Sequence, residues 1–198
     1  MFSSITSKPY VVVWLITAKC NLSCKHCYAK QYLEVSELSL KEKLKLAEEI
    51  GELGVGWVAI SGGEPLIHKD TIPVIEKLRD YSIEVSISSN ATVVNEALAR
   101  KLSRLDVYVY VSIDGPEKVH DILRGKGTFR KTIESIKIFK KHSVEYGTVM
   151  AVGKPNKNFV KEYLELALSI DAGSISIIPI MPTKHRANSE YVLSPKEY

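Results

Sequence analysis

Hydrophobic positions along the chain change their spacing in a regular order. Short runs rich in β-branched and aromatic residues alternate with segments in which apolar residues recur every three or four positions, so strands and helices are expected in turn. The first run, Val11–Thr17, is apolar almost throughout and predicts a strand buried on both faces of a parallel sheet. Five further strands are predicted near Trp57–Ser61, Ile83–Ser88, Asp106–Ile113, Val144–Val152 and Ser174–Ile180.

Helix signals fill the segments between these strands. Ser39 and Glu42 form a capping-box pattern, and the apolar residues that follow at helical spacing are Leu40, Leu44, Ala47 and Ile50. Four more helices are predicted near Thr71–Arg79, Asn95–Ser103, Thr128–His142 and Asn158–Ile170. Ser194–Glu197 repeats the start signal, with a proline at the first helical position. We therefore expect a helix to begin there, and the chain to be the N-terminal piece of a longer protein or to carry a disordered tail.

Strand parity distinguishes between the two folds that alternating βα units can form, a barrel and a doubly wound sheet. In Asp106–Ile113 every second residue is Val or Ile, whereas the residues between them are Tyr108, Tyr110 and Ser112. Ile83–Ser88 alternates in the same way. A strand covered by helices on both faces should be apolar on both. The polar face therefore favours an α/β barrel with a ligand-filled lumen.

Charge and hydropathy exclude several classes of function. The net charge of +4 comes from 27 basic and 23 acidic residues that are interspersed along the chain, as on solvated helix faces, so nucleic acid is not an expected partner. No apolar run is long enough to span a bilayer, and the start lacks the pattern of a signal peptide. We expect no membrane partner and, by default, a cytoplasmic location.

The three cysteines, Cys20, Cys24 and Cys27, all fall in one short segment directly after the first predicted strand. An odd number of thiols at this spacing argues against disulfides and for a metal site in a reducing compartment. Three thiolates on one loop can bind three irons of a cubane cluster and leave the fourth open. The alternative is a zinc site completed by His26 or a distant histidine, although zinc sites usually pair two Cys-x-x-Cys hooks and this chain has no second one.

This Cys-x-x-x-Cys-x-x-Cys segment resembles the defining motif of the radical S-adenosylmethionine (radical SAM) superfamily. The resemblance implies a four-iron, four-sulfur (4Fe-4S) cluster on the three cysteines and S-adenosyl-L-methionine as a second cofactor. In the family an aromatic residue before the third cysteine lies near the adenine. That position is His26 here, with Tyr28 just after the motif, and His26 could equally lie behind the site or at the surface.

A Gly-Gly-Glu-Pro stretch, Gly62, Gly63, Glu64 and Pro65, ends the second predicted strand. Two adjacent glycines permit a close approach of backbone and ligand, although an ordinary strand-to-helix turn is the simpler reading. The stretch resembles the family segment that binds the amino group of the methionine moiety. By that resemblance its carbonyl groups, helped by the Glu64 carboxylate, face the ammonium.

Two later strand ends also resemble superfamily segments. By resemblance, Ser112 and Arg124 hold the methionine carboxylate, for which a guanidinium fork is well suited. Asp114 faces the ribose or the substrate, or caps the turn before Gly115. Ser88 and Asn90 correspond to polar residues near the ribose and methionine, in a segment where the family glycine is replaced by alanine in this chain. Arg124 as an ordinary surface arginine is the alternative.

The resemblance extends from about residue 11 to 186 and implies a partial (β/α)6 TIM-like barrel of parallel strands, open on one side. We expect one core domain, residues 1–198, with the barrel at 10–186 and the start of a truncated C-terminal region at 187–198. The most similar subgroup carries SPASM or twitch-type C-terminal extensions with auxiliary clusters. Its members modify peptides, haem precursors or other cofactors, and any auxiliary cluster would lie beyond residue 198.

The implied function is reductive cleavage of S-adenosylmethionine to a 5′-deoxyadenosyl radical, which abstracts hydrogen from a peptide, small-molecule or cofactor-precursor substrate. An electron donor such as ferredoxin or flavodoxin is the expected partner. Met181 and His185 could face substrate but are expected to be core and loop residues, and no catalytic acid or base is identified. Two other classes stay open: a zinc- or cluster-binding scaffold without activity, and a methyltransferase that binds the same cofactor without a cluster.

Overall fold

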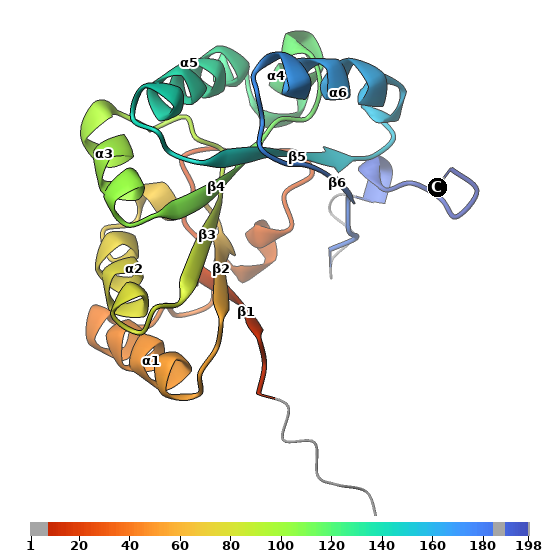
Figure 1. Cartoon of the computed structure of the whole chain (residues 1–198). Helices are drawn as coiled ribbons and strands as arrows, with labels where there is room; N and C mark the ends of the chain where they lie inside the picture. The colour runs from red at the N-terminus through yellow and green to blue at the C-terminus, as the bar shows by residue number, and fades with distance from the viewer. Residues whose placement is uncertain (1–7, 184–188, 198) are drawn as a thin grey trace, which may run out of the picture.

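The computed structural model describes residues 8–183 and 189–197. Its centre is one sheet of six parallel strands, arranged in sequence order from β1 to β6. The first and last strands are not paired with each other, so the sheet curves into a barrel that stays open on one side (Figure 1). The strands are β1 Val11–Thr17, β2 Trp57–Gly62, β3 Glu84–Ser89, β4 Val107–Ser112, β5 Tyr146–Val152 and β6 Ile175–Pro179.

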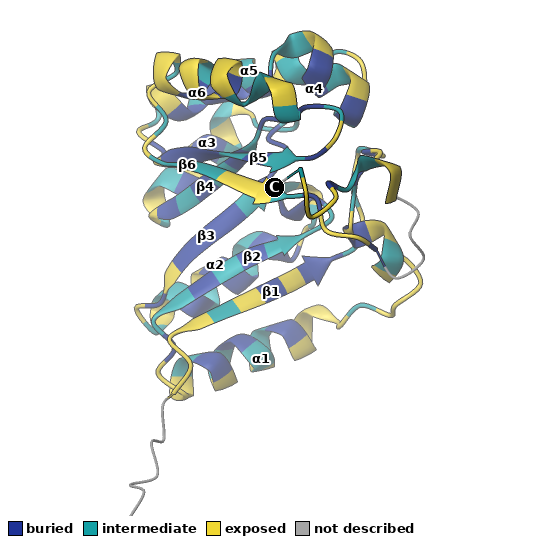
Figure 2. Ribbon diagram, turned by 90° about the vertical axis from the view of Figure 1, so that its right-hand side faces the viewer, coloured by how far each residue is buried: buried dark blue, intermediate teal, exposed yellow. Residues whose placement is uncertain are grey.

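Helices cover the outer face of this sheet and leave the concave face without a helical layer (Figures 1 and 2). Their bounds are α1 Leu40–Glu52, α2 Thr71–Asp80, α3 Glu96–Arg104, α4 Glu117–Arg124, α5 Thr128–Lys141 and α6 Val160–Ser169. Short 3₁₀ turns are η1 Ala29–Tyr32, η2 Pro65–Ile67, η3 Lys157–Phe159 and η4 Ser189–Tyr191. This arrangement confirms the predicted α/β fold, a partial (β/α)6 TIM-like barrel.

The signals that predicted individual helices form as expected. Ser39 accepts a hydrogen bond from the Glu42 amide, and the Glu42 carboxylate accepts one from the Ser39 amide at 2.8 Å, so the capping box at α1 is complete. Asn95 caps α3 by accepting from the Leu98 amide at 2.9 Å. In the described part of the chain, every helix is too short or too polar to span a bilayer.

Strand β4 has the predicted parity. Val107, Val109 and Val111 are buried beneath the helices, whereas Tyr108 and Tyr110 are half-buried on the concave face. A polar and aromatic concave face is what a barrel requires if its lumen holds a ligand. Strand parity therefore predicted the correct one of the two candidate folds.

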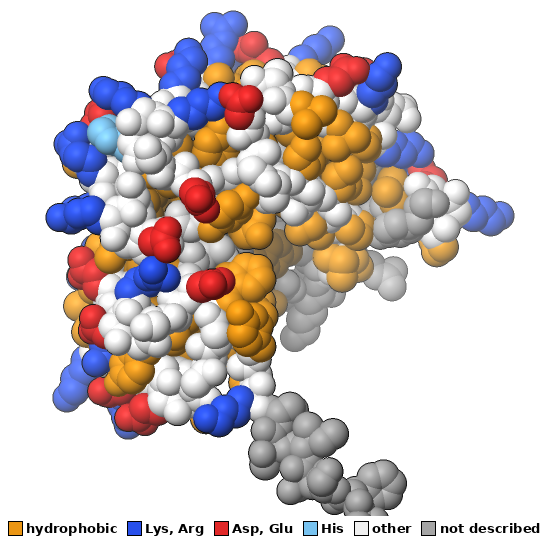
Figure 3. All heavy atoms as spheres, viewed as in Figure 1, with side chains coloured by type: hydrophobic (Ala, Val, Ile, Leu, Met, Phe, Trp, Pro, Cys, Tyr) orange, Lys and Arg blue, Asp and Glu red, His pale blue; other side chains and the backbone are white. Residues whose placement is uncertain are grey.

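The prediction for β1 was wrong in one respect. The strand has the predicted bounds, but it lies at the edge of the sheet and is not covered on its concave face. Val11 and Leu15 are each 42% exposed and Val13 is 64% exposed, while Trp14 and Ile16 pack under the helices. Figure 3 shows hydrophobic side chains on the molecular surface over β1 and over the β5–β6 end of the sheet. An apolar run alone could not reveal that one face has no protein partner.

Two other differences concern helices. The sequence did not predict α4, a short helix that buries Val119, His120 and Leu123. At Ser194–Glu197 the expected start contacts form, with the Ser194 amide donating to the Glu197 carboxylate at 2.9 Å, but the described residues make one turn and no helix. His185, Arg186 and the rest of 184–188 lie outside the described residues.

Candidate functional site

The carboxyl ends of the six parallel strands lie along one edge of the sheet, which we call the carboxyl edge. The cysteine loop, residues 18–28, follows β1, and the Gly62–Pro65 turn lies at the end of β2. Asn90 follows β3, and Asp114 follows β4. Four segments that are distant in sequence therefore meet at the edge where barrel folds usually place their sites.

The cysteine loop contains three free thiols, of which Cys24 is buried and Cys20 and Cys27 are half-buried. Burial raises the pKa of Cys24 to about 11 and also raises the pKa of Cys20, so metal binding must displace protons from these thiols. Across residues 8–183 and 189–197, no three His, Cys, Asp or Glu side chains lie close enough together to hold a single metal ion. The donor set nevertheless fits a cubane cluster, because three thiolates can each bind a different iron.

Lys25 and Tyr28 are two of the residues whose hydrogen bonds attach this loop to neighbouring elements. The Lys25 amide donates to the Leu123 carbonyl of α4 at 2.9 Å. The Tyr28 hydroxyl bonds to Ser61 Oγ, at the end of β2, at 3.0 Å. The loop is therefore held between the second strand and the helix that the sequence did not predict.

The glycine pair allows β2 to approach the start of the cysteine loop. The Gly63 amide donates to the Thr17 carbonyl at 2.7 Å. Gly62 has a φ of +125°, and a Cβ on it would lie 2.2 Å from Thr17 O. A Cβ on Gly63 would lie 2.1 Å from Lys19 O. Since both contacts are with backbone, neither could relax by a side-chain movement, and this explains why both positions are glycine.

The side chain of Glu64, a residue of this turn, is fully buried. Its carboxylate accepts hydrogen bonds from Ser89 Oγ at 2.7 Å, from the Asn90 amide at 2.7 Å and from the Leu66 amide at 3.0 Å. Burial raises the pKa of Glu64, although these donors oppose the shift. In this position the carboxylate ties the end of β2 to the end of β3. Its expected help to the ammonium stays a prediction.

We expect Glu64→Gln to destabilise the protein by about 1–3 kcal/mol, because the new amide group would face a donor that it cannot accept from. Denaturant unfolding of the purified chain measures this difference. Glu76→Gln on the exposed face of α2 is the matched control and should stay within about 0.5 kcal/mol of the parent. Equal unfolding midpoints for the two variants would show that the Glu64 hydrogen bonds do not stabilise the fold.

Asn90 connects the end of β3 with the cysteine loop. Its Nδ2 donates to Asn21 Oδ1 at 3.0 Å and lies 3.8 Å from Cys20 Sγ. The next residue, Ala91, has a φ of +56°, the left-handed conformation that a glycine adopts without strain. Alanine therefore keeps the backbone conformation that the family glycine would allow.

Arg124 and Asp114 form a bidentate pair at the end of β4. Arg124 Nε donates to Asp114 Oδ2 at 2.6 Å, and Nη2 donates to Oδ1 at 3.3 Å. Burial lowers the pKa of Arg124, but Asp114 and the thiols of Cys24 and Cys27 outweigh it and raise the pKa. Arg124, whose side chain is 11% exposed, is thus a largely shielded cation close to the cysteine loop, and the surface alternative is wrong.

His26 and Tyr28, the two rings predicted to lie near the adenine, differ in their exposure. His26 is buried, with Nε2 3.4 Å from Asp114 Oδ2. Tyr28 is 40% exposed and reaches across to β2. Burial lowers the pKa of His26, although Asp114 acts in the opposite direction. Of the two rings, Tyr28 is therefore the more accessible to a planar ligand.

Ser88 and Ser112 lie on the concave face of β3 and β4, where both are half-buried. Among the described residues, no hydrogen bond involves either hydroxyl, so both are available to a ligand. Pro65 is buried as the first residue of η2. The structure thus brings every residue predicted for cofactor binding to the carboxyl edge.

Sequence reasoning missed a charged network behind the cysteine loop. Glu37 accepts from Thr17 Oγ1 at 2.6 Å and contacts His68 Nε2 at 3.1 Å. Lys43, 1% exposed, donates to Asp70 at 3.1 Å. A charged residue of a helix usually faces solvent, so Lys43 was not counted in the buried face of α1. Its spacing of four and seven positions from the buried Ala47 and Ile50 was the available signal.

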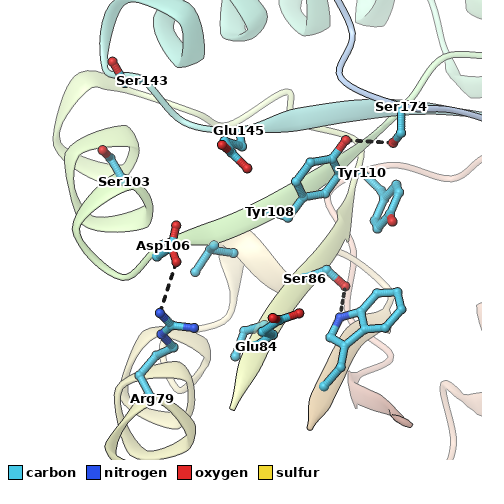
Figure 4. A pocket seen from close by; sticks show the side chains of 13 residues that line it. Arg79, Glu84, Ser86, Ser103, Asp106, Tyr108, Tyr110, Ser143, Glu145 and Ser174 are labelled. Atoms are coloured by element: carbon cyan, nitrogen blue, oxygen red, sulfur yellow. Dashed lines mark hydrogen bonds and ion pairs between the residues drawn. The ribbon is translucent and has the colours of Figure 1, made fainter. Parts of the chain in front are cut away.

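A separate pocket of about 440 Å³ lies at the opposite edge of the sheet, at the amino ends of the strands (Figure 4). The Tyr108 hydroxyl and Ser174 Oγ lie 2.7 Å apart, and Trp57 Nε1 donates to Ser86 at 2.9 Å. The pocket lining includes none of the three cysteines. This hollow is therefore distinct from the candidate cofactor site.

Residues 14–167 match the sequence profile of the radical SAM superfamily. The match covers more than half of the chain, and the chain therefore belongs to this superfamily.

Named relatives give a more specific comparison. The AdoMet-dependent heme synthase of Methanosarcina barkeri is 30% identical over 200 residues, which cover 98% of this chain and 57% of that protein. The cysteine-type anaerobic sulfatase-maturating enzyme of Clostridium novyi is 27% identical over 203 residues, covering 92% and 54%. The solved structure of native anSMEcpe with bound AdoMet and Kp18Cys peptide has a TM-score of 0.79 at 25% identity, over 96% of this chain and 57% of that one. The chain thus spans about half the length of the relatives it matches.

Proposed function

We propose that this chain is the core of a radical SAM enzyme, which binds a 4Fe-4S cluster and S-adenosylmethionine and cleaves the latter reductively. The observation that carries the proposal is the convergence of three free thiols, a glycine pair in backbone contact with their loop, and an ion-paired arginine at one edge of the barrel. Together these features support a cofactor site.

The cysteine loop supplies the ligands for the cluster. Cys20, Cys24 and Cys27 would each bind one iron as thiolates, so the fourth iron would have no protein ligand from this loop. When bound, the two cofactors would supply one electron for cleavage of the sulfonium and a carbon-centred radical that abstracts hydrogen. The protein contributes position and the exclusion of water.

Residues along the carboxyl edge would bind S-adenosylmethionine. Arg124, with Nη1 not used by Asp114, and the open Ser112 hydroxyl suit the methionine carboxylate. Backbone carbonyls at Gly62 and Gly63 suit the ammonium. The exposed ring of Tyr28, the Ser88 hydroxyl and the Asn90 side chain would line the adenine and ribose part of the site.

The substrate that we propose is a peptide, small molecule or cofactor precursor. Support comes from the relatives, whose names refer to haem synthesis and to sulfatase maturation. A ferredoxin or flavodoxin would supply the electron. The boundary of the core domain near residue 187 stays a prediction.

Anaerobic reconstitution with iron and sulfide tests the proposal. The purified chain should turn brown, bind about four irons for each chain and form 5′-deoxyadenosine from S-adenosylmethionine only when dithionite is present. A zinc-binding scaffold would stay colourless and form none. A methyltransferase without a cluster would form S-adenosylhomocysteine without a reductant. Either result would overturn the proposal.

A further inference from the structure

Asp114 is a buried acid whose carboxylate is occupied by protein groups on several sides. The side chain is fully buried. Besides the two contacts with Arg124, Oδ1 accepts from the Ala151 amide of β5 at 3.0 Å. A carboxylate without access to water stays ionised only when such partners replace its hydration. Burial by itself would raise the pKa of Asp114, but Arg124 and His26 more than offset burial and lower this pKa. The lowered pKa is consistent with an ionised carboxylate.

These contacts agree with neither role expected for Asp114. A residue that binds ribose or substrate needs an accessible oxygen, and Asp114 has no exposed side-chain surface. A cap for the turn before Gly115 would accept hydrogen bonds from that turn, whereas the amide bound by this carboxylate belongs to Ala151. The side chain is therefore placed to orient other residues.

Two groups from different parts of the chain meet at this carboxylate. Arg124 uses Nε and Nη2 for the fork, and in the described part of the chain no hydrogen bond involves its Nη1. His26, within the cysteine loop, lies 3.4 Å from Oδ2. The neighbouring Lys25 amide bonds to the carbonyl of Leu123, the residue before Arg124. One carboxylate thus sets the position of the arginine relative to the loop.

The backbone of Asp114 is fixed as well. Its amide donates to His120 Nδ1 at 3.3 Å, and its carbonyl accepts from Asn156 Nδ2 at 3.1 Å. Burial lowers the pKa of His120 to about 4, so this ring is a neutral acceptor. Both the carboxylate and the backbone on which it stands are therefore held in place.

We propose that Asp114 is a positioning residue, which holds the Arg124 guanidinium against the cysteine loop so that Nη1 meets the carboxylate of the amino-acid cofactor. The inference rests on the proposed function, because it takes the carboxylate of S-adenosylmethionine as the ligand of Arg124. It adds that recognition of this carboxylate depends on a residue that never touches the cofactor.

The test compares S-adenosylmethionine with its decarboxylated analogue, which lacks only the group that Arg124 is proposed to bind. Dissociation constants are measured by equilibrium dialysis on the anaerobically reconstituted full chain. Asp114→Asn keeps the shape of the side chain but removes its charge. We expect this variant to raise the dissociation constant of S-adenosylmethionine about 10- to 100-fold, as for loss of a charge-assisted contact. The dissociation constant of the analogue should change less than about threefold.

Glu117→Gln is the matched control. It breaks an exposed pair at 2.7 Å with Arg130 Nε, close to Asp114 in sequence, and should change neither dissociation constant. A positioning role also predicts non-additivity, because Asp114→Asn should have little further effect in an Arg124→Ala background.

Arg124→Lys keeps the positive charge without the fork and covers the case in which Asp114→Asn fails to fold. It should weaken the binding of S-adenosylmethionine and leave the binding of the analogue unchanged. Equal weakening of both ligands, or unchanged affinity for S-adenosylmethionine, would overturn the positioning role while leaving the proposed function intact. A parent protein that loads a cluster but binds neither ligand would overturn both.

Discussion

The Cys24→Ser variant is expected to lose its cluster and to form no measurable 5′-deoxyadenosine, a fall of at least about a thousandfold in rate. Cys24 is the buried member of the three thiols, so no solvent ligand can readily replace it. A serine hydroxyl is a much weaker ligand for iron because it stays protonated where a thiol ionises on metal binding. Iron and sulfide content, visible absorbance and product formation under dithionite measure the effect.

Ser23→Ala is the control for this variant. Ser23 is exposed in the same loop, and its substitution removes a side-chain hydroxyl without removing a thiol. It should retain the iron content and rate of the parent within about twofold. A Cys24→Ser protein that still turned over S-adenosylmethionine would indicate a methyltransferase that works without a cluster, and the proposed function would fail.

The second large effect is expected for Gly63→Ala, which should destabilise the fold by about 3 kcal/mol or more and lower cluster loading. The new Cβ would lie 2.1 Å from Lys19 O and 2.6 Å from Ala18 O. Both atoms belong to the start of the cysteine loop, so relief of the clash must move the backbone that positions Cys20. Denaturant unfolding reports the first effect, and iron content after reconstitution reports the second.

Gly127→Ala is the control for this variant, because it introduces backbone strain without a steric clash. Gly127 has a φ of +79°, and a Cβ there would meet no atom within 4 Å. Only the conformational cost of a left-handed alanine, about 1 kcal/mol, is then expected, with normal cluster loading. If Gly63→Ala lowered stability and cluster loading no more than Gly127→Ala, the close approach between β2 and the cysteine loop would not be important for the site.

The strand errors show where the hydrophobic pattern stops being informative. For β4 the alternation of Val with Tyr was sufficient, because a period of two directly assigns side chains to faces. For β1 the apolar run predicted burial on both faces, yet Val13 is 64% exposed. The sequence of one strand does not say whether it lies at the centre or the edge of a sheet.

The helix errors have a similar cause. Helix α4 spans only Glu117–Arg124, too short for a repeating apolar face to be distinguished from chance. In α1 the buried face includes Lys43, whose charge is compensated by Asp70 from a different part of the chain. Leu40, one of the apolar residues at helical spacing, is 39% exposed. Which face of a helix is buried therefore depends on residues that are distant in sequence and come into contact only on folding.

The sequence by itself determined the local features of this protein: six strands with helices between them, the capping box at Ser39, and a set of thiols close enough in the chain to share one metal centre. These follow from neighbouring residues, whose spacing is fixed by covalent geometry. Only the tertiary structure decided that Glu64 ties two strand ends together and that Asp114 lies between Arg124 and the cysteine loop. Their partners come from separate strands and helices, and a buried carboxylate is stable only where the fold supplies donors to it.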